Sequence, residues 1–302
     1  MSSDLPEKLQ DEVCPAFLTI GHVTRDLLPD GDSIPGGTAT FAALTASRLG
    51  VFAGIVSCAD EALRTLLASL LPGVALAIRS TPATTTFENR YSAGFRVQYL
   101  RERSTPLEAA DIPAAWSGAP VTLLAPLAQE ISPALVRNLS LQPGSLLAAT
   151  PQGWLRRWDT DGRVWPTPWE GAEELLPLLD VLILSHDDLL PFADGQRTAA
   201  DALLADWSRR VPLLVATDGR HGATLFENGI PRQFPAYTAT EVDPTGAGDV
   251  FAAAFLIYFS QHHRADEATN FANCVASLSI EYPGIAGIPT PEQIAQRLRP
   301  LS

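Results

Sequence analysis

The segment 243–249, Asp-Pro-Thr-Gly-Ala-Gly-Asp, contains the residues best suited to chemistry. It runs directly into residues 250–259, a stretch that is apolar on every side and therefore predicts a helix buried in the core. The small residues Gly246, Ala247 and Gly248 would leave the backbone N–H groups at the start of this helix open. The helix dipole adds positive potential at the same place, so the segment favours the binding of a phosphate group.

Asp249 stands at the same end of the predicted helix, where a carboxylate would repel a bound phosphate. Its position is explained if it orients and deprotonates an attacking hydroxyl group. Positioning and charge stabilisation dominate phosphoryl transfer, so a weak base that accepts the proton late is sufficient. The alternative is that Asp249 only caps the helix or complements its dipole. Because Gly-Ala-Gly directly precedes it, we favour the catalytic interpretation.

Lysine is almost absent from the chain, since Lys8 is the only one. A Walker A loop requires a lysine, and protein kinases place a strand lysine on the nucleotide phosphates, so both of these routes to ATP are excluded. No G-x-S-x-G or H-E-x-x-H motif occurs, so the commonest hydrolase signatures are also missing. A phosphate site made of backbone N–H groups is what such a chain would need.

The composition is that of a folded, acidic protein. Of its 302 residues 46% are hydrophobic and 18% are charged, and the formal net charge is −13. This charge offers no basic surface to nucleic acid or to an anionic membrane, so we expect neither as a partner. The three cysteines form no C-x-x-C pair, and residues 1–12 lack signal-peptide features and are expected to be flexible. We therefore expect a cytoplasmic protein.

Five short apolar runs, bounded by Pro, Gly or Asp, alternate with helix-like stretches. Each run is too short for a buried helix, which predicts central strands of a mostly parallel sheet. The runs cover residues 16–20, 121–124, 146–149, 181–184 and 213–216. Helices are predicted between them, for example at 38–49, 132–139 and 198–209, the spacing of βαβ units. The predicted fold is a doubly wound α/β domain over residues 13–302.

A hairpin signature interrupts this rhythm. Residues 84–91 and 95–100 are rich in Thr, Tyr, Phe and Val, and Ser-Ala-Gly at 92–94 supplies the turn. Residues 22–35 are also non-helical and rich in Gly, Pro and Asp. We interpret residues 22–36 and 82–104 together as a small lid over a site. The alternative is an ordinary hairpin at the edge of the main sheet.

The motif at 243–249 resembles the signature of the ribokinase-like (PfkB-type) carbohydrate kinases. Residues 36–50 look like that family's first signature, a Gly-Gly pair followed by a helix and Leu-Gly. Residues 216–223 resemble the strand and turn that bind nucleotide phosphates, and residues 271–274 resemble the stretch beside the adenine. Asp26 stands where the family keeps an aspartate for substrate hydroxyls. Four elements in the right order make the resemblance specific, and it covers nearly the whole chain.

The resemblance implies a three-layer sandwich with a mostly parallel central sheet and a small β-strand lid. It also implies ATP and Mg²⁺ as cofactors, with Mg²⁺ bridging the phosphates. The implied catalytic residues are Asp249 with Gly246, Ala247 and Gly248 as the anion hole. The implied nucleotide-binding residues are Ser185, Thr217, Gly219, Gly222, Thr245 and Asn273. The implied substrate-binding residues are Asp26, Gly36, Gly37, Phe41, Asn89 and Gln98.

Two positions depart from the family's pattern. Phe41 stands where many relatives carry an asparagine that hydrogen-bonds the sugar, so ribose becomes a doubtful substrate. Asn89 or Gln98, on the hairpin, could replace that contact. The family's Asn-x-x-Glu motif becomes Ser185-His-Asp-Asp188, in which Asp188 could still act on Mg²⁺ through water. A plain Asp-rich turn after a strand is the alternative for this second site.

These residues predict an ATP-dependent phosphotransferase that acts on a hydroxyl of a sugar or sugar-like molecule. An inositol, another polyol or a nucleoside could equally be the acceptor on the same fold. A second class of function is a non-catalytic sugar or nucleotide sensor, which the altered positions Phe41 and Ser185 suggest. An exposed edge of the lid could pair two subunits into a homodimer.

Overall fold

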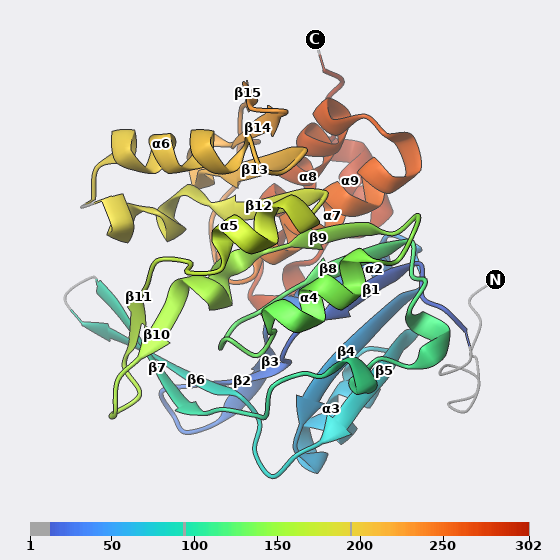
Figure 1. The fold of residues 1–302 in the computed structure, drawn as a ribbon, viewed down its shortest axis with the longest axis vertical. Coiled ribbons are helices and arrows are strands. Elements are labelled where there is room, and N and C mark those ends of the chain that lie inside the picture. The colour runs from blue at the N-terminus through green and yellow to red at the C-terminus, as the bar shows by residue number, and fades with distance from the viewer. Residues whose placement is uncertain (1–12, 93–94, 194, 302) are drawn as a thin grey trace.

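The computed structural model describes residues 13–92, 95–193 and 195–301 (Figure 1). Within these ranges nine strands form a central sheet in the order β15-β14-β13-β12-β9-β8-β1-β4-β5. They are β1 (Phe17–Ile20), β4 (Ala53–Ala59), β5 (Val74–Ser80), β8 (Val121–Leu124), β9 (Leu146–Ala149), β12 (Val181–Ser185), β13 (Leu213–Thr217), β14 (Ala223–Glu227) and β15 (Ile230–Phe234). All neighbours from β13 to β5 are parallel. Strand β14 is antiparallel to both of its neighbours, β13 and β15, so among these described strands it alone runs in the opposite direction.

The five predicted strands all exist. Residues 121–124 and 146–149 coincide with β8 and β9, and the other three runs differ from β1, β12 and β13 by one residue. Strand β4 was not predicted from the sequence. It is buried along its whole length but contains Gly, Ser and Cys between its apolar residues. The pattern of a fully buried strand is therefore interrupted there, and the run looks shorter than it is.

Helices cover both faces of the central sheet, as Figure 1 shows. They are α2 (Thr38–Arg48), α3 (Glu61–Leu70), α4 (Pro133–Ser140), α5 (Ala172–Leu175), α6 (Arg197–Trp207), α7 (Ala247–His262), α8 (Ala265–Ser279) and α9 (Pro291–Arg297). Side chains of α2, α3, α7, α8 and α9 pack on one face, and those of α4, α5 and α6 pack on the other. The chain thus forms the expected three-layer α/β sandwich.

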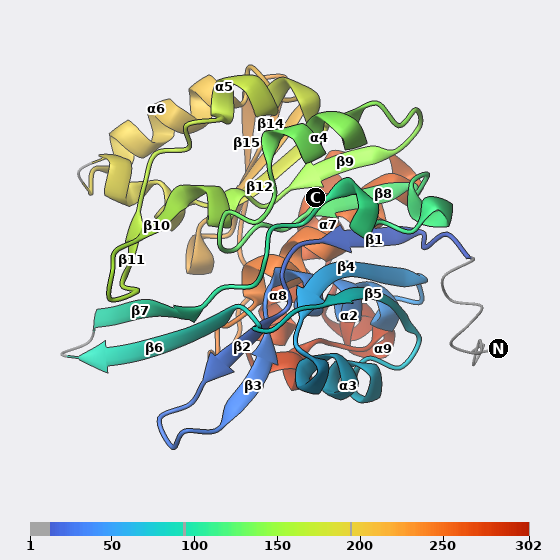
Figure 2. The same cartoon turned by 60° about the horizontal axis from the view of Figure 1, so that its bottom comes forward.

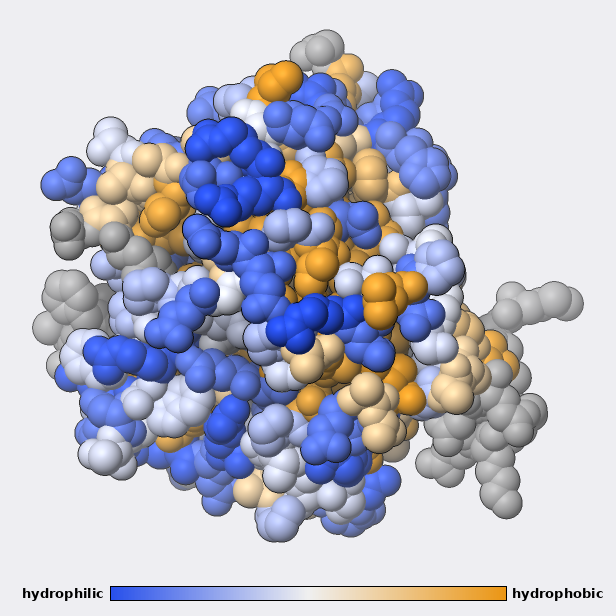
Figure 3. Space-filling model, in the orientation of Figure 1, coloured by the Kyte–Doolittle hydropathy of each residue, from blue (hydrophilic) through white to orange (hydrophobic). Residues whose placement is uncertain are grey.

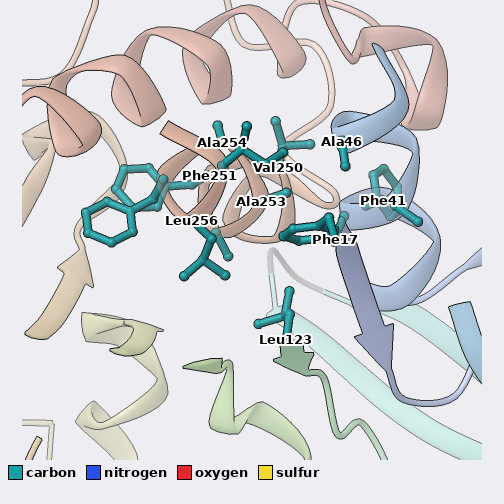
Figure 4. Close-up of a cluster of buried hydrophobic side chains, with 14 of the residues drawn as sticks. Phe17, Phe41, Ala46, Leu123, Val250, Phe251, Ala253, Ala254 and Leu256 are labelled. Atoms are coloured by element: carbon teal, nitrogen blue, oxygen red, sulfur yellow. The ribbon is translucent and has the colours of Figure 1, made fainter. Parts of the chain in front are cut away.

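Helix α7 lies in the first of these two cores. Its residues from Val250 to Ile257 are all buried, so the helix has no polar face. Figure 4 shows Val250 and Ala253 near Phe17 of β1, with Phe41 and Ala46 of α2 close by. The predicted buried helix is confirmed, and its start is held rigidly between the sheet and α2.

A second, smaller sheet of four strands projects from the sandwich (Figures 1 and 2). Its order is β3-β2-β6-β7, with β2 at Thr24–Leu27, β3 at Ser33–Gly36, β6 at Thr86–Ser92 and β7 at Phe95–Glu102. Both of the predicted lid segments contribute strands to it. The alternative of an edge hairpin on the main sheet is wrong, because β6 and β7 pair with β2 and with each other. The predicted turn at 93–94 and the predicted flexible stretch 1–12 lie outside the described residues.

His22 joins three of the chain segments that connect the small sheet to the sandwich. Its Nδ1 lies 2.7 Å from Oγ1 of Thr85, and its Nε2 lies 2.9 Å from the carbonyl oxygen of Thr105. The carbonyl oxygen can only accept, so we assign the proton to Nε2 and an accepting role to Nδ1. The side chain of His22 is fully buried, so the base of the small sheet is closely packed.

Four tryptophans lie between residues 154 and 169, and two of them belong to a packed aromatic cluster. Trp154 stacks on Trp169 with ring centroids 4.9 Å apart, and Trp169 meets Trp207 edge-on at 5.6 Å. Strands β10 (Arg156–Trp158) and β11 (Val164–Pro166) form an antiparallel hairpin in the same region. In both Figure 1 and Figure 2 this hairpin lies beside β7 of the small sheet.

The face of the molecule seen in Figure 3 is mostly hydrophilic, with smaller hydrophobic groups scattered over it. In the described ranges, no helix is both long enough and apolar enough to span a bilayer.

Candidate active site

The start of α7 requires glycine at position 246 for two reasons. Gly246 has a φ of 78°, in the left-handed region that side chains disfavour. A Cβ built on it would also lie 2.4 Å from the ring of Phe41. The ring of Phe41 in α2 therefore packs against the turn into α7, and only glycine fits at position 246.

This turn leaves backbone donors at the helix start. The first N–H groups of a helix have no partner within the helix. That of Ala247 donates to the carbonyl oxygen of Pro244 at 3.2 Å. A Cβ on Gly248 would meet nothing within 4 Å, so open space lies beside this residue. The N–H groups of Gly248 and Asp249 thus border a space that the helix dipole makes attractive to an anion.

Asp249 is half-buried at this helix start. Burial raises the pKa of its carboxyl group to about 6, from an ordinary value of 3.8. A hydrogen bond from Thr38 and the positive charge of Arg156 oppose this rise in pKa, whereas the charges of Asp188 and Asp26 add to it. The carboxylate is therefore ionised at neutral pH and more basic than an exposed aspartate. A raised pKa in such a place is typical of a group that takes up a proton.

The Gly-Gly pair and Asp26 meet at the base of the small sheet. A Cβ on Gly36 would lie 2.3 Å from Oδ2 of Asp26, and a Cβ on Gly37 would lie 2.8 Å from the carbonyl oxygen of His22. Gly37 also has a φ of 91° and caps the start of α2, whose first residue is Thr38. The two glycines therefore let the carboxylate of Asp26 and the start of α2 approach each other closely.

Asn89 and Gln98 lie directly opposite each other on β6 and β7, and Gln98 donates to Oδ1 of Asn89 at 3.0 Å. They alternate with Glu88 and Tyr99, so they share a side of the sheet with Phe87 and Leu100. Those two apolar residues pack against Leu127 and Ala128 of the sandwich. Asn89 and Gln98 are thus on the side of the small sheet that faces the body of the protein.

The side chain of Phe41 does not line an open part of this site. It is only 4% exposed and belongs to the core beneath Gly246. The expectation that it contacts the substrate is therefore corrected: a ring held in the core supports the helix start and offers no free face. An asparagine in its place would have to bury its amide against the same glycine.

The residues expected to bind the nucleotide lie along neighbouring loops. Thr217 ends β13, and Gly219 and Gly222 shape the turn that follows, both with positive φ. A Cβ on Gly222 would lie 2.0 Å from the carbonyl oxygen of Phe234. The exposed Thr245 donates its backbone N–H to Asp243. These residues are brought to one edge of the central sheet, where its parallel strands end.

Asn273 differs from this pattern. It is buried, and its amide nitrogen lies 3.3 Å from the carbonyl oxygen of Pro235 and 3.5 Å from that of Phe234. Its donors are therefore turned toward the protein's own backbone. In this structure Asn273 holds the loop after β15 against α8.

Ser185 and Asp188 close a local turn after β12. The backbone N–H of Ser185 donates to Oδ2 of Asp188 at 3.1 Å, and the side chain of Gln152 also hydrogen-bonds this carboxylate. Burial raises the pKa of Asp188, and the positive charge of Arg156 opposes the rise. The motif forms a turn after a strand that is closed by a capping box, and the charge of its Asp188 carboxylate also acts on Asp249.

The acidic groups near the helix start fit Mg²⁺ only as a partner of bound phosphates. Across the described part of the chain, no three His, Cys, Asp or Glu side chains are grouped to hold a metal ion. Mg²⁺ usually keeps several waters and uses one or two carboxylates together with substrate phosphates. Asp188, whose charge interacts with that of Asp249, could supply such a carboxylate.

Two residues of this site were missed from the sequence. Thr38 hydrogen-bonds Asp249, and the charge of Arg156 acts on both Asp249 and Asp188. Thr38 directly follows the Gly-Gly pair at a helix start, and this position could have pointed to it. Arg156 lies in a short hairpin about 90 residues earlier in the chain, and no local pattern connects it with Asp249.

Comparison with known proteins agrees with this architecture. A family model described as pfkB family carbohydrate kinase matches residues 159–293. A probable fructokinase-5 of Arabidopsis thaliana is 29% identical over 167 residues, which cover 51% of each chain. A 2-dehydro-3-deoxygalactonokinase of Haloferax volcanii is 29% identical over 177 residues, covering 56% of this chain and 55% of its own. The chain therefore spans about half the length of the curated relatives it matches.

Solved structures resemble the chain over almost its whole length. A pyrophosphate-dependent kinase of the ribokinase family, seen with sulfate, has a TM-score of 0.79 at 23% identity and covers 93% of this chain and 99% of its own. Arabidopsis thaliana ribokinase with ribose and ATP has a TM-score of 0.73 at 20% identity and covers 95% and 99%. Together with the family match over part of the chain, these likenesses show that it has the fold of the ribokinase-family kinases and that it resembles the pfkB family of carbohydrate kinases.

Proposed function

We propose that this protein transfers a phosphoryl group to a hydroxyl of a sugar or sugar-like small molecule. The observation that carries the proposal is the meeting, at the start of one buried helix, of open backbone donors with a carboxyl group of raised pKa. The backbone N–H groups can donate hydrogen bonds to the transferred phosphoryl group, and the carboxylate can accept the proton of the acceptor hydroxyl. A site that only bound an anion would gain nothing from a negative charge at this position.

The proton passes from the acceptor hydroxyl to Oδ of Asp249, which is ionised at neutral pH. The N–H groups of Gly248 and Asp249 face the phosphoryl oxygens, and Arg156 supplies a positive charge at the site of this lysine-poor chain. Thr38 hydrogen-bonds Asp249 and so fixes the direction of its carboxylate. Mg²⁺, when bound, would neutralise charge on the donor phosphates, with Asp188 beside it.

Asp26, Asn89 and Gln98 suit an acceptor with several hydroxyl groups. All three are half-buried polar residues of the small sheet. In the parallel pairing of β2 with β6, Asp26 is the partner of Phe87, which places it in the same cross-strand row as the inward-facing residues. A sheet that presents polar groups in this way above a reactive carboxylate would act as the lid. Its further pairing into a homodimer and a cytoplasmic location remain predictions.

Two phosphoryl donors deserve a direct comparison. ATP is the donor that the family resemblance implies. Pyrophosphate is the second candidate, because the amide of Asn273 donates to the protein's own backbone instead of facing a base. A pyrophosphate-dependent kinase with bound myo-inositol is also among the similar folds, with a TM-score of 0.78 at 23% identity.

An acceptor panel tests the proposal. The purified full chain is incubated with Mg²⁺ and either ATP or pyrophosphate, together with fructose, ribose, a 2-dehydro-3-deoxy sugar acid, myo-inositol or a nucleoside. We expect phosphorylated product, with release of ADP or orthophosphate, for at least one acceptor. No acceptor-dependent transfer from either donor would contradict the proposal. Tight binding of an acceptor by calorimetry without turnover would instead support a sensor.

A further inference from the structure

The hairpin 156–166, formed by β10, β11 and the turn between them, connects the small sheet with the reaction centre. We call it the bridging hairpin. One end of it carries Arg156, whose charge acts on Asp249 and Asp188. The other end lies against β7, the outer strand of the small sheet (Figure 2). The two ends are joined by three residue pairs of antiparallel sheet.

Backbone contacts fix the tip of the bridging hairpin to β7. The N–H of Leu100 donates to the carbonyl oxygen of Gly162 at 2.7 Å, and Tyr99 forms an antiparallel bridge with Arg163. Arg101 of β7 also donates to the carbonyl oxygen of Asp161 at 3.2 Å. The hairpin therefore occupies the hydrogen-bonding edge of β7, which a free edge strand would leave open.

Gly162 is the point of closest approach. A Cβ on this residue would lie 2.3 Å from the carbonyl oxygen of Leu100, and its φ of 85° disfavours any side chain. A substituted residue would have to move either β7 or the hairpin tip, because the obstructing atom is backbone. The contact exists only because residue 162 is glycine.

Side-chain contacts tie the turn of the hairpin to its two strands. Asp159 accepts hydrogen bonds from the N–H of Arg163 at 2.9 Å and from the indole of Trp165 at 2.8 Å. Trp158 and Val164 pack against the cluster that Phe87 and Leu100 of the small sheet form with Leu127 and Ala128. These contacts tie the turn and both strands into one unit, so a shift at the tip must reach the base.

The base of the hairpin holds Arg156 between the lid and the sandwich. Its guanidinium carbon lies 5.7 Å from the centre of the Phe87 ring of β6. Its carbonyl oxygen accepts a hydrogen bond from the side chain of Gln129 at 2.6 Å. Arg156 is therefore placed by the small sheet on one side and by the sandwich on the other.

We propose that Gly162 is a positioning residue that, through the bridging hairpin, sets the place of Arg156 from the position of the small sheet. Docking of the small sheet over the site would then also place the positive charge of Arg156 at the reaction centre. This inference rests on the proposed function, in which Arg156 acts on the transferred phosphoryl group. A displacement of about 1 Å in such a group can cost ~100-fold in rate.

A double-mutant cycle separates this role from a merely structural one. Gly162→Ala is made in the natural protein and in the Arg156→Ala variant, and kcat is measured with a saturating acceptor. We expect a loss of ~10-fold or more in kcat in the natural background and less than ~2-fold in the Arg156→Ala background. Equal losses in both backgrounds, or no loss in the natural one, would overturn the inference. Full activity of Arg156→Ala alone would overturn it as well.

Matched controls keep the test specific. Gly144 has a φ of 80° and nothing within 4 Å of a built Cβ, so Gly144→Ala imposes the same backbone strain without touching the lid and should keep full kcat. If Gly162→Ala does not fold, Arg101→Ala replaces it. Arg90 is its control, because both arginines pair with Glu88 and lie over Tyr99 but only Arg101 donates to Asp161. Arg101→Ala should lower kcat ~2- to 5-fold more than Arg90→Ala does, and equal effects of the two would contradict the inference.

Hydrogen exchange tests the coupling without reference to activity. In Gly162→Ala, amides of residues 97–102 and of residues 154–158 should both exchange faster than in Gly144→Ala. Unchanged exchange at 154–158 would show that the base of the hairpin does not sense its tip, which would overturn the inference. If the natural protein phosphorylates no acceptor, the proposed function fails, and this measurement still decides whether the hairpin couples the two ends.

Discussion

Asp243 and Asp249 bound the same seven-residue segment, yet their surroundings differ. Oδ1 of Asp243 accepts the N–H of Thr245 at 3.0 Å, and Oδ2 accepts the N–H of Gly284 at 2.9 Å. Burial alone would raise the pKa of Asp243, but a hydrogen bond from the side chain of Thr245 and these two backbone hydrogen bonds outweigh it and lower the pKa. At Asp249 burial prevails and the pKa rises to about 6.

The difference between them assigns two roles to one residue type. Asp243 stabilises its charged form with backbone donors and so fixes the loop that leads into α7. Burial makes the charged form of Asp249 less favourable. The raised pKa that results is the condition for a base that accepts a proton near neutral pH. In the proposed function, Asp243 shapes the loop before the anion site and Asp249 is the base beside it.

Replacing Asp249 is expected to have the largest effect on activity. Asp249→Asn keeps the shape of the side chain but cannot accept the acceptor's proton, so kcat should fall by ~10²- to 10⁴-fold. Steady-state kinetics with the best acceptor of the panel measures the loss. A variant with more than a tenth of the natural kcat would remove Asp249 from the role of base.

The same substitution should stabilise the fold. Because the folded-state pKa of Asp249 lies above 3.8, its contribution favours the folded protein at low pH and is lost as pH rises through about 6. Asp249→Asn should therefore raise the free energy of unfolding by ~1–3 kcal/mol at pH 7, and the gain should vanish below about pH 4. Urea unfolding at pH 7 and pH 4 checks both values. A loss of stability at pH 7 would mean that burial does not strain this carboxylate.

Removing the positive charge beside Asp249 should give the next largest effect. Arg156→Ala is expected to lower kcat ~10- to 100-fold, a typical loss for a group that stabilises transition-state charge. It should also raise the pKa of Asp249 further, because Arg156 favours the ionised form. Arg157→Ala is the matched control, since Arg157 is its exposed neighbour on the same strand. Equal kinetics of the two variants would contradict the role of Arg156.

Replacing Asp243 should act on stability before activity. Asp243→Ala leaves the N–H groups of Thr245 and Gly284 without their acceptor, so the free energy of unfolding should fall by ~1–3 kcal/mol. Because the pKa of Asp243 is lowered, this difference from the natural protein should be present at neutral pH and shrink as pH falls below about 4. Thermal unfolding across this pH range provides the measurement. A kcat loss as large as that of Asp249→Asn would erase the distinction between the two residues.

These comparisons also show how far the sequence could predict the site. The buried helix, its small first residues and Asp249 are neighbours in the chain, so local pattern and chemistry were enough to find them. The same holds for β8 and β9, which are apolar apart from Thr122. Strand β4 was not predicted, because Gly, Ser and Cys interrupt its apolar pattern, although the strand is completely buried in the sheet.

The remaining features depend on contacts between distant segments. The charge of Arg156 acts on Asp249, and nothing in residues 156–166 predicts that the hairpin carrying Arg156 docks on β7. Phe41 was interpreted as a substrate contact from its place in the family's pattern, but the packing of α2 against Gly246 keeps it in the core. The amide of Asn273 is likewise turned toward backbone by the loop after β15. Such orientations follow from tertiary packing and not from spacing in the chain.

The pH dependence of kcat/KM tests the central claim most directly, because it reports ionisation of the free enzyme. With an acceptor and donor that do not themselves titrate in the range, kcat/KM should be flat above about pH 7. It should decline with a slope of one below an apparent pKa of about 6, the value for Asp249. In Arg156→Ala the decline should begin at a higher pH. A natural enzyme whose kcat/KM stays constant down to pH 4 would contradict the assignment of Asp249 as a base with raised pKa.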